Sequence, residues 1–191
     1  MRISAVIMCS GFGRRMGKNK LLMEFNGRRM FEHIIDTVKN CSFDKIVAVT
    51  SYDEIAEYSS EFTVIRNDGA EEGISASVRL GAEASSDCDA IMFFTADQPL
   101  LTSDIILKLI SEFKKTGKIT IPTVNGKNKN PVIFPIKYLD EIMKLKGEQG
   151  GKQIYKMHPK DICSVCFFDE KPFYDIDTID DYRFIKNCLQ K

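Results

Sequence analysis

The chain has 191 residues, of which 43% are hydrophobic and 28% are charged, so it is long enough to bury a substantial core. Its 27 Lys and Arg residues balance its 27 Asp and Glu residues, and no overall field favours nucleic acid or an anionic membrane. No apolar run approaches the roughly 20 residues of a membrane span. We therefore predict a cytoplasmic protein that binds a small anionic ligand and has no nucleic-acid or membrane partner.

In chain order, apolar runs typical of strands alternate with apolar residues at helical spacing. The first half predicts strands at 3–8, 45–50, 62–66 and 90–95, and helices from Met30 and over 53–59 and 73–81. The second half predicts strands at 118–122, 131–135 and 164–168, and helices over 105–113, 138–143 and after Asp177. This alternation is typical of an α/β fold with a mostly parallel sheet, in one domain.

The stretch after the first predicted strand, residues 8–20, combines glycines with a local excess of positive charge. Glycines let backbone amides approach a ligand closely, and the nearby cations would neutralise phosphate. The glycines and cations are Gly11, Gly13, Gly17, Arg14, Arg15, Lys18 and Lys20. The pattern predicts a polyphosphate-binding loop, and a solvated basic turn is the alternative.

Two well-known phosphate loops do not fit this stretch. A Walker A loop has four residues between its first glycine and the Gly-Lys pair, whereas five separate Gly11 from Gly17, and Asn19 stands where Ser or Thr would bind magnesium. A dinucleotide fingerprint would need glycine in place of Met16. The loop is therefore a different kind of phosphate binder, or it binds no phosphate.

Asp97 follows the most apolar predicted strand, residues 90–95. Open α/β sheets bind ligands at the carboxyl ends of their strands, so Asp97 is the best single candidate for a catalytic residue. The alternative is a turn or helix-capping aspartate before Pro99. Cys163 and Cys166 form a C-x-x-C without a second pair, and we expect them to pack in the core rather than bind metal.

Several motifs together resemble one enzyme superfamily. The stretch from Cys9 to Lys20 is similar to the L-A-A-G-x-S/G-x-R-M-G-x-x-K signature of nucleotidyltransferases with a Rossmann-like, glycosyltransferase-A-type fold. Ala-Asp-Gln-Pro at 96–99 resembles the molybdenum cofactor cytidylyltransferase branch more than the guanylyltransferase branch, which usually has Cys-Asp-x-Pro. Three further segments resemble motifs of the cytidylyltransferase branch: 73–81 its G-x-x-x-S-x-x-x-G, 130–134 its G-x-P-V-L-F and 175–181 its D-I-D-T-P-E-D.

The resemblance implies a three-layer α/β/α Rossmann-like fold with a mostly parallel sheet, of the nucleotide-diphospho-sugar transferase type. It implies a single nucleotidyltransferase domain over 1–191, with a nucleotide-binding half at about 1–100 and an acceptor-binding half at about 101–191.

The implied reaction transfers CMP from CTP to the terminal phosphate of molybdopterin and releases pyrophosphate. Mg²⁺ is the implied cofactor, and an acceptor molybdoenzyme or its chaperone is a further implied partner. Two enzymatic alternatives are a guanylyltransferase of the molybdenum cofactor and a sugar-phosphate or methylerythritol-phosphate nucleotidyltransferase. A nucleotide-sensing binding module is the alternative without catalysis.

The same resemblance implies a role for each of a set of site residues. The implied catalytic residues are Arg15, Lys20 and Asp97. The implied nucleotide-binding residues are Cys9, Ser10, Gly11, Gly13, Gly17, Lys20, Gly73, Ser75 and Ser77. Asp97 and Asp177 are the implied metal ligands, and Asn130 and Lys152 the implied acceptor-binding residues. For Asp177, a structural cap at the start of the final helix is an equal alternative, although Thr178 and Asp181 also have capping-box spacing.

Overall fold

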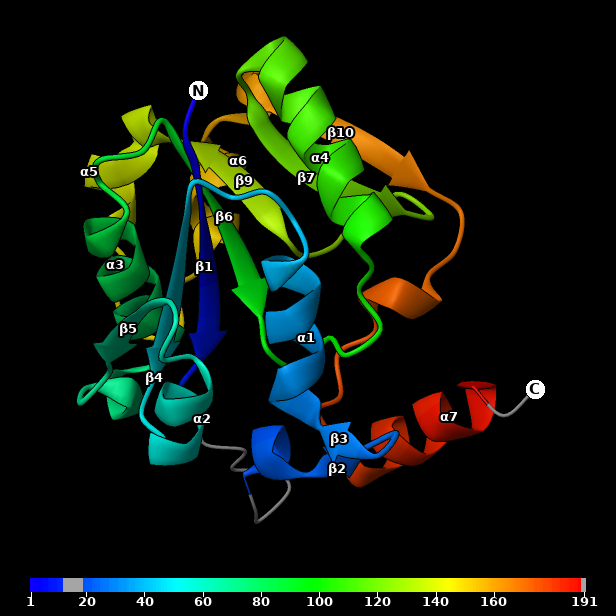
Figure 1. Cartoon of the computed structure of the whole chain (residues 1–191). Coiled ribbons are helices and arrows are strands. Elements are labelled where there is room, and N and C mark those ends of the chain that lie inside the picture. Colours follow the sequence, from blue (N-terminus) through cyan, green and yellow to red (C-terminus); the bar gives the residue numbers. More distant parts are fainter. Residues whose placement is uncertain (12–18, 190–191) are drawn as a thin grey trace.

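A mostly parallel sheet of eight strands runs through the molecule (Figure 1). The computed structural model describes residues 1–11 and 19–189. The main strands are β1 Ile3–Cys9, β4 Lys45–Thr50, β5 Thr63–Arg66, β6 Ala90–Thr95, β7 Ile119–Val124, β8 Lys127–Asn128, β9 Val132–Pro135 and β10 Ile162–Phe167. Their order in the sheet is β10-β7-β9-β6-β1-β4-β5, with β8 paired to β7. Among the described strands of this sheet, only β8 and β9 run antiparallel to their neighbours.

Helices connect these strands along the chain. The α-helices are α1 Met30–Lys39, α2 Asp53–Tyr58, α3 Ile74–Ala84, α4 Ser103–Thr116, α5 Leu139–Ile142, α6 Gly151–Met157 and α7 Ile179–Leu189. Short 3₁₀ helices are η1 Lys20–Leu22, η2 Ala70–Glu72, η3 Ile136–Tyr138, η4 Pro159–Asp161 and η5 Lys171–Phe173.

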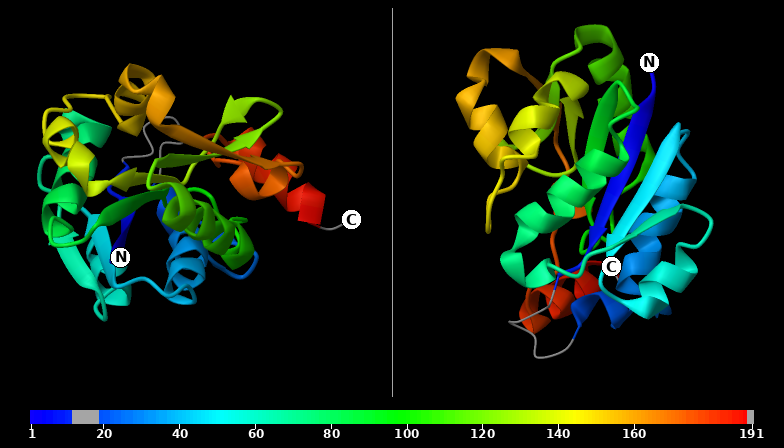
Figure 2. Two further views of the ribbon diagram at one scale, coloured as in Figure 1. Left: turned by 90° about the horizontal axis from the view of Figure 1, so that it is seen from above. Right: turned by 90° about the vertical axis from the view of Figure 1, so that its left-hand side faces the viewer.

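The helices cover both faces of the sheet, as the two views of Figure 2 show. On one face, Phe31 of α1 and Leu109 of α4 pack in a cluster with Ile7 of β1. On the other face, Val78 of α3 packs in a second cluster with Val6 of the same strand. Because β1 alternates its side chains between the two clusters, it is buried on both sides, as expected of a central parallel strand. The predicted three-layer α/β/α fold is confirmed.

A third, smaller hydrophobic cluster packs the C-terminal part of the chain against the segment between β1 and α1. Phe25 lies in the two-stranded hairpin of β2 Glu24–Phe25 and β3 Arg28–Arg29, and it packs with Ile176 and with Ile185 of α7. The cluster brings α7 beside the hairpin at the edge of the molecule that carries the carboxyl end of β1 (Figure 1).

The structure contains elements that were not predicted from the sequence, and it corrects the prediction for one cysteine. Strand β8 pairs with β7, and β2 pairs with β3 in a hairpin before α1. Helix α6 begins at Gly151. Cys163 packs against the core as expected, but Cys166 is exposed, so the core prediction is wrong for Cys166.

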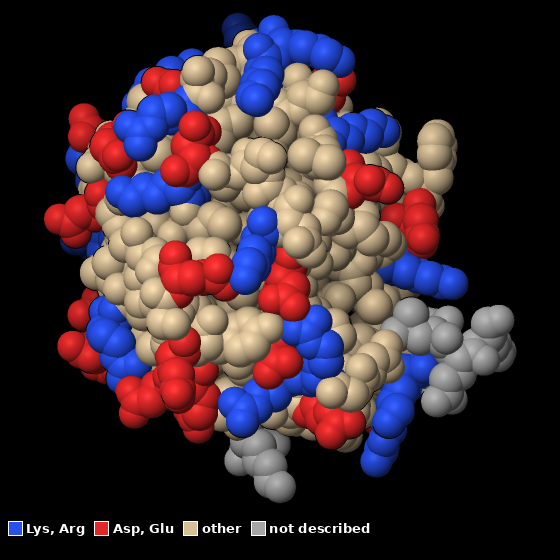
Figure 3. Space-filling view, viewed as in Figure 1, with Lys and Arg blue, Asp and Glu red and all other residues tan. Residues whose placement is uncertain are grey.

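Charged side chains of both signs are interspersed on the face shown in Figure 3, in keeping with the balanced composition. Among the described residues, none of the helices has the length and apolar character needed to cross a bilayer.

Gly81 of α3 provides a test of this packing. A Cβ atom at Gly81 would lie 2.2 Å from Cγ1 of Val6, a fully buried side chain of β1. We expect Gly81→Ala to lower the free energy of unfolding by about 1–2 kcal/mol, since overpacking outweighs the gain in helix propensity. Denaturant unfolding measures the free energy of unfolding, and Glu83→Ala on the exposed side of α3 is the control. A Gly81→Ala variant as stable as the wild type would contradict the packing described.

Candidate active site

The candidate site lies where the order of the parallel strands reverses. From β1 the chain passes to β4 and β5 on one side and then returns through α3 to β6 on the other side of β1. Open α/β sheets bind ligands outside the carboxyl ends of their strands, at the point where the strand order reverses. Here that crevice lies beyond Cys9 of β1 and Thr95 of β6.

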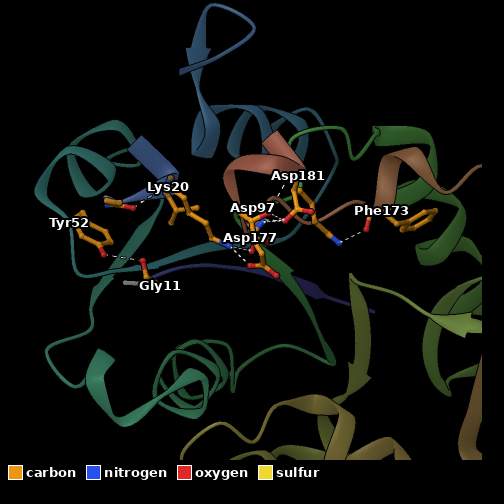
Figure 4. A network of polar contacts seen from close by, with 11 residues as sticks. Gly11, Lys20, Tyr52, Asp97, Phe173, Asp177 and Asp181 are labelled. Carbon is orange, nitrogen blue, oxygen red and sulfur yellow. Dashed lines mark hydrogen bonds and ion pairs between the residues drawn. The ribbon is translucent and has the colours of Figure 1, made fainter. Parts of the chain in front are cut away.

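Three charged side chains meet at this crevice (Figure 4). The Nζ of Lys20 lies 2.7 Å from Oδ2 of Asp97 and 2.7 Å from Oδ1 of Asp177. The side chain of Lys20 is 11% exposed, that of Asp97 is 18% exposed and that of Asp177 is 51% exposed. One ammonium group thus bridges two carboxylates that are far apart in the sequence, and the crevice remains accessible through Asp177.

Local structure places Lys20 at this point. Asn19 caps the 3₁₀ turn η1 by accepting a hydrogen bond from the backbone amide of Leu21 through its side-chain oxygen, at 3.1 Å. Leu21 is buried in the core cluster beneath α1 and anchors the turn. Because a short capped turn with a buried leucine has few alternative conformations, the Lys20 side chain emerges in a defined direction.

Asp177 precedes helix α7, and the structure assigns the capping role to its neighbours. The Oδ2 of Asp181 accepts a hydrogen bond of 2.8 Å from the backbone amide of Thr178, and the Thr178 hydroxyl accepts one of 3.1 Å from the amide of Asp181. These reciprocal bonds form a capping box. The capping alternative for Asp177 is therefore wrong: its carboxylate points to Lys20.

The capping alternative for Asp97 is also wrong. Helix α4 begins at Ser103 with Thr102 as its N-cap residue, well beyond Asp97. The backbone carbonyl of Asp97 accepts a hydrogen bond from the amide of Ile176 at 3.0 Å, which joins the end of β6 to the segment before α7. Its Oδ1 atom is buried and accepts no hydrogen bond from any residue that the structure describes.

The electrostatics of the crevice favour a bound cation. Burial would lower the pKa of Lys20, but the charges and hydrogen bonds of Asp97 and Asp177 outweigh burial and raise it, so Lys20 stays protonated. Burial, together with the charges of Asp97 and Asp177, raises the pKa of Asp175 to about 7. The described groups around Lys20 thus carry more negative than positive charge near neutral pH.

Asp97 and Asp177 are the described residues that could hold a divalent cation. Carboxylate oxygens are the ligands that Mg²⁺ prefers, and Asp97 retains a buried oxygen without a donor. The described residues contain no group of three or more His, Cys, Asp or Glu side chains arranged for metal binding. Two carboxylates completed by phosphate oxygens of a substrate are a common Mg²⁺ environment, so the residues fit the group without forming a cage of their own.

A first cavity of about 430 Å³ opens from this crevice. Four of the predicted nucleotide-binding residues besides Lys20 line it: Ser10, Gly11, Gly73 and Ser77. Gly11 is held in place by Tyr52, whose hydroxyl donates a hydrogen bond of 3.0 Å to the Gly11 carbonyl (Figure 4). Lys20, Asp97 and Asp177 also line this cavity, so the charged end of a ligand bound in it would lie beside Lys20.

Gly73, in the wall of the first cavity, packs closely against the backbone of Gly147. Its φ is +102°, which only glycine adopts readily, and a Cβ there would lie 2.6 Å from the backbone of Gly147. The amide of Ser75 also donates to the Gly147 carbonyl at 3.1 Å. These contacts fix the loop that carries Glu148 against the start of α3.

Other predicted site residues lie elsewhere. Cys9 is fully buried in the core beneath α1, and burial raises the pKa of its thiol, so this side chain does not line the cavity. Ser75 is fully buried, with its hydroxyl bonded to Arg79 at 3.0 Å, so it too is removed from the cavity. Gly13, Arg15 and Gly17 lie outside the described residues.

A second cavity of about 420 Å³ adjoins the first. It is lined by both predicted acceptor-binding residues, Asn130 and Lys152. Sequence reasoning missed several further polar residues of its wall, among them Gln98, Lys129, Glu148 and Asp175. Gln98 and Asp175 lie inside motifs already recognised in the sequence, so their positions carried a signal, and Glu148 lies in the glycine-rich segment that contains Lys152. Lys129 lies in a polar loop without such a motif.

The two cavities share part of their walls. Met8, Ile74, Thr95 and Glu148 line both, and Asp97 and Asp177 line the first while Asp175 lines the second. Ligands in the two cavities would therefore meet beside the three aspartates and Lys20.

The capping box of α7 leads to a stability prediction. Asp181→Ala should lower the free energy of unfolding by about 1 kcal/mol at neutral pH, because two backbone amides lose their acceptor. A hydrogen bond from Thr178 lowers the pKa of Asp181, so this contribution is present above the unfolded pKa of about 3.9 and is lost as the pH falls through the lower folded value.

Thermal unfolding at pH 7 and pH 3 checks this. The control is Asp180→Ala, which removes only an exposed pair with Arg183. Equal melting temperatures for the Asp181 and Asp180 variants at pH 7 would contradict the assignment.

Comparison with known sequences and structures identifies the family of this chain. The sequence model of the MobA-like NTP transferase domain matches residues 5–162. A molybdenum cofactor guanylyltransferase of Shewanella sediminis (strain HAW-EB3) is 24% identical over 196 residues, which cover 100% of this chain and 99% of that protein. The crystal structure of Rv0371c from Mycobacterium tuberculosis H37Rv has a TM-score of 0.87 at 20% identity and covers 98% of both chains.

A crystal structure of Rv0371C in complex with manganese has a TM-score of 0.80 at 18% identity, covering 98% of this chain and 99% of that one. These structural likenesses establish the shared fold, and the sequence match spans both strands that carry the crevice. The chain belongs to the family of MobA-like NTP transferase domains.

Proposed function

We propose that this nucleotidyltransferase transfers GMP from GTP to the terminal phosphate of molybdopterin and releases pyrophosphate. The observation that carries the proposal is the pair of adjoining cavities that meet where Lys20 bridges Asp97 and Asp177. A transferase needs two substrates held side by side, with cationic groups at the point where their phosphates approach. A module that only senses a nucleotide would need the first cavity alone.

We assign the nucleotide to the first cavity and the acceptor to the second. The first is built mainly from residues 8–97 and reaches Lys20, in keeping with a nucleotide-binding half at about 1–100. The second draws Asn130 and Lys152 from the remaining half, at about 101–191. Within the segment 12–18, we propose that the amides of Gly13 and Gly17 and the side chain of Arg15 complete the triphosphate site, as the resemblance implies.

The reaction requires two anions to be brought together. An oxygen of the acceptor phosphate attacks the α-phosphorus of the nucleotide, and the bond from that phosphorus to the bridging oxygen of the β-phosphate breaks, so that pyrophosphate leaves. Positioning and charge stabilisation account for most of the catalysis of such a step. Lys20 would stabilise negative charge on the phosphates, and Asp97 and Asp177 would hold a divalent cation, which neutralises phosphate charge when bound.

We propose Mg²⁺ as this cation. The fit rests on the free buried oxygen of Asp97 and on the half-exposed carboxylate of Asp177. The manganese complex of Rv0371C supports a divalent cation in a protein of the same fold.

Two candidate bases have specific support. The named relatives are guanylyltransferases, including a probable one in Pyrococcus horikoshii that is 24% identical over 201 residues, and this favours GTP. The segments at 96–99, 73–81, 130–134 and 175–181 resemble the cytidylyltransferase branch and favour CTP. Because the named guanylyltransferases match along nearly the whole chain whereas these segments are short, the guanylyl alternative is better supported than CMP transfer.

Pyrophosphate release with each nucleoside triphosphate and molybdopterin tests this assignment. We expect kcat/KM for GTP to exceed that for CTP by at least about tenfold, as expected when polar groups of a site pair with one base and not the other. Parallel reactions with sugar phosphates and methylerythritol phosphate in place of molybdopterin test the acceptor. Equal or faster turnover with CTP would restore the cytidylyl assignment, and turnover only with a sugar phosphate would exclude molybdopterin.

Asp97→Asn tests the proposed metal ligand. The substitution keeps the size of the side chain but removes its charge, so we expect turnover to fall by about 10²–10³-fold and the required Mg²⁺ concentration to rise. Asp104→Asn, in the exposed first turn of α4, is the matched control and should behave as the wild type. Turnover titrated with Mg²⁺ and thermal unfolding are measured on the same samples. Normal turnover at low Mg²⁺ would show that Asp97 does not hold the metal.

A further inference from the structure

The wall of the second cavity contains a positively charged side chain that none of the recognised sequence motifs includes. Lys129 lies in the wall of this cavity, at the end of the β8 hairpin, with a side chain that is only 19% exposed. Its backbone amide donates a hydrogen bond of 2.8 Å to the carbonyl of Pro122 in β7. The turn before it passes through Asn125 and Gly126 with positive φ values of 50° and 73°. The hairpin therefore holds Lys129 against the sheet.

An ion pair fixes the Lys129 side chain. Its Nζ lies 2.7 Å from Oε1 of Glu170, which belongs to the segment between β10 and η5. The hydrogen bond from Lys129 lowers the pKa of Glu170, so the pair is charged at neutral pH. An ammonium group has three donors, and this ion pair occupies one, which leaves Lys129 capable of binding a further acceptor.

The rest of the second cavity has the composition of a site for an amphipathic phosphate ester. Lys152, from the first turn of α6, supplies another cation to the same wall. Apolar side chains from several elements supply a surface for a ring system: Ile74, Val78, Phe93, Val132, Phe134 and Ile142. Gln98 is 1% exposed, and its Oε1 receives no hydrogen bond from any described residue, although its Nε2 donates to the Phe173 carbonyl at 3.4 Å. Gln98 therefore leaves one acceptor in this wall without a donor from the described residues.

The second cavity is also lined by acidic side chains, which affect how a phosphate can bind there. Asp175 and Glu148 also line it, and both repel a phosphate unless cations neutralise the anion. Lys129 and Lys152 are the two lysines among the lining residues, and Glu170 orients Lys129 without lining the cavity itself.

We propose that Lys129, oriented by Glu170, binds the phosphate of the acceptor together with Lys152. The proposal rests on the proposed function in one respect, that the acceptor occupies the second cavity. It assigns to the acceptor a phosphate monoester attached to a flat ring system whose face packs on the apolar wall, and it makes Glu170 a positioning residue for this substrate.

Steady-state kinetics with GTP and molybdopterin test this on the full-length enzyme. We expect Lys129→Met to raise the KM for molybdopterin about tenfold and Glu170→Gln to raise it about threefold, with the KM for GTP and kcat unchanged. Lys129→Arg should restore most of the affinity. The control is Lys127→Met, an exposed residue of the same hairpin that does not line either cavity. A structural ion pair would instead lower the melting temperature and leave the molybdopterin KM unchanged, which would overturn the proposal.

A second measurement separates this proposal from the proposed function. If the wild type releases no pyrophosphate with molybdopterin, the proposed function fails, and calorimetric titration with inorganic phosphate decides the role of Lys129. A non-hydrolysable GTP analogue and Mg²⁺ fill the first cavity during this titration. The proposal predicts a phosphate Kd about fivefold higher for Lys129→Met than for Lys127→Met. Equal Kd values for these two variants would overturn it.

Discussion

The ammonium group of Lys20, nearly buried between the carboxylates of Asp97 and Asp177, organises the site of this protein. Removing such charges from water costs several kcal/mol per ion, and the cost is recovered only when the geometry and the hydrogen bonds of the pair are good. Both contacts are 2.7 Å long, and Asp177 stays half-exposed, so the arrangement is charged and accessible at once. With Asp175 alongside, the described crevice holds an excess of carboxylates that suits a divalent cation and a triphosphate bound together.

The fold is what brings these groups together. Lys20 is separated from Asp97 by 77 positions in the sequence and from Asp177 by 157. The parallel pairing of β1 with β6 places Asp97 beside the loop after β1, and the hydrogen bond from Ile176 to the Asp97 carbonyl brings the last segment to the same point. The packing of α7 on the β2–β3 hairpin closes this arrangement. A change far along the chain, in the third core cluster, can therefore reach the crevice through Asp177.

Much of this architecture could be predicted from local sequence. The strand at 90–95 was apparent from its unbroken apolar run, and the position of Asp97 followed from the carboxyl-end rule for parallel sheets. The β2–β3 hairpin was missed although Asn26-Gly27 is a strong hairpin signal, because strands of two residues carry no measurable periodicity. Strand β8 was missed for the same reason.

The predicted site residues show where sequence stops being sufficient. Cys9 and Ser75 were selected from motifs, but the motif fixes only the path of the backbone, and the alternation along β1 and the turn of α3 send both side chains into the interior. The sequence could not show which of Asp177 and Asp181 caps α7 and which faces the site, because both lie at the start of the same helix. Only the tertiary contact between Asp177 and Lys20 distinguishes them. Lys129 and Glu170 pair across 41 positions, and no local pattern predicts that contact.

Anomalous diffraction from crystals grown with Mn²⁺ and a non-hydrolysable GTP analogue tests the central claim most directly. The account predicts one anomalous peak within coordination distance of the carboxylates of Asp97 and Asp177, with the Lys20 ammonium moved onto the nucleotide phosphates in the first cavity. A nucleotide bound elsewhere, with Lys20 still bridging the two aspartates and no metal beside them, would contradict it.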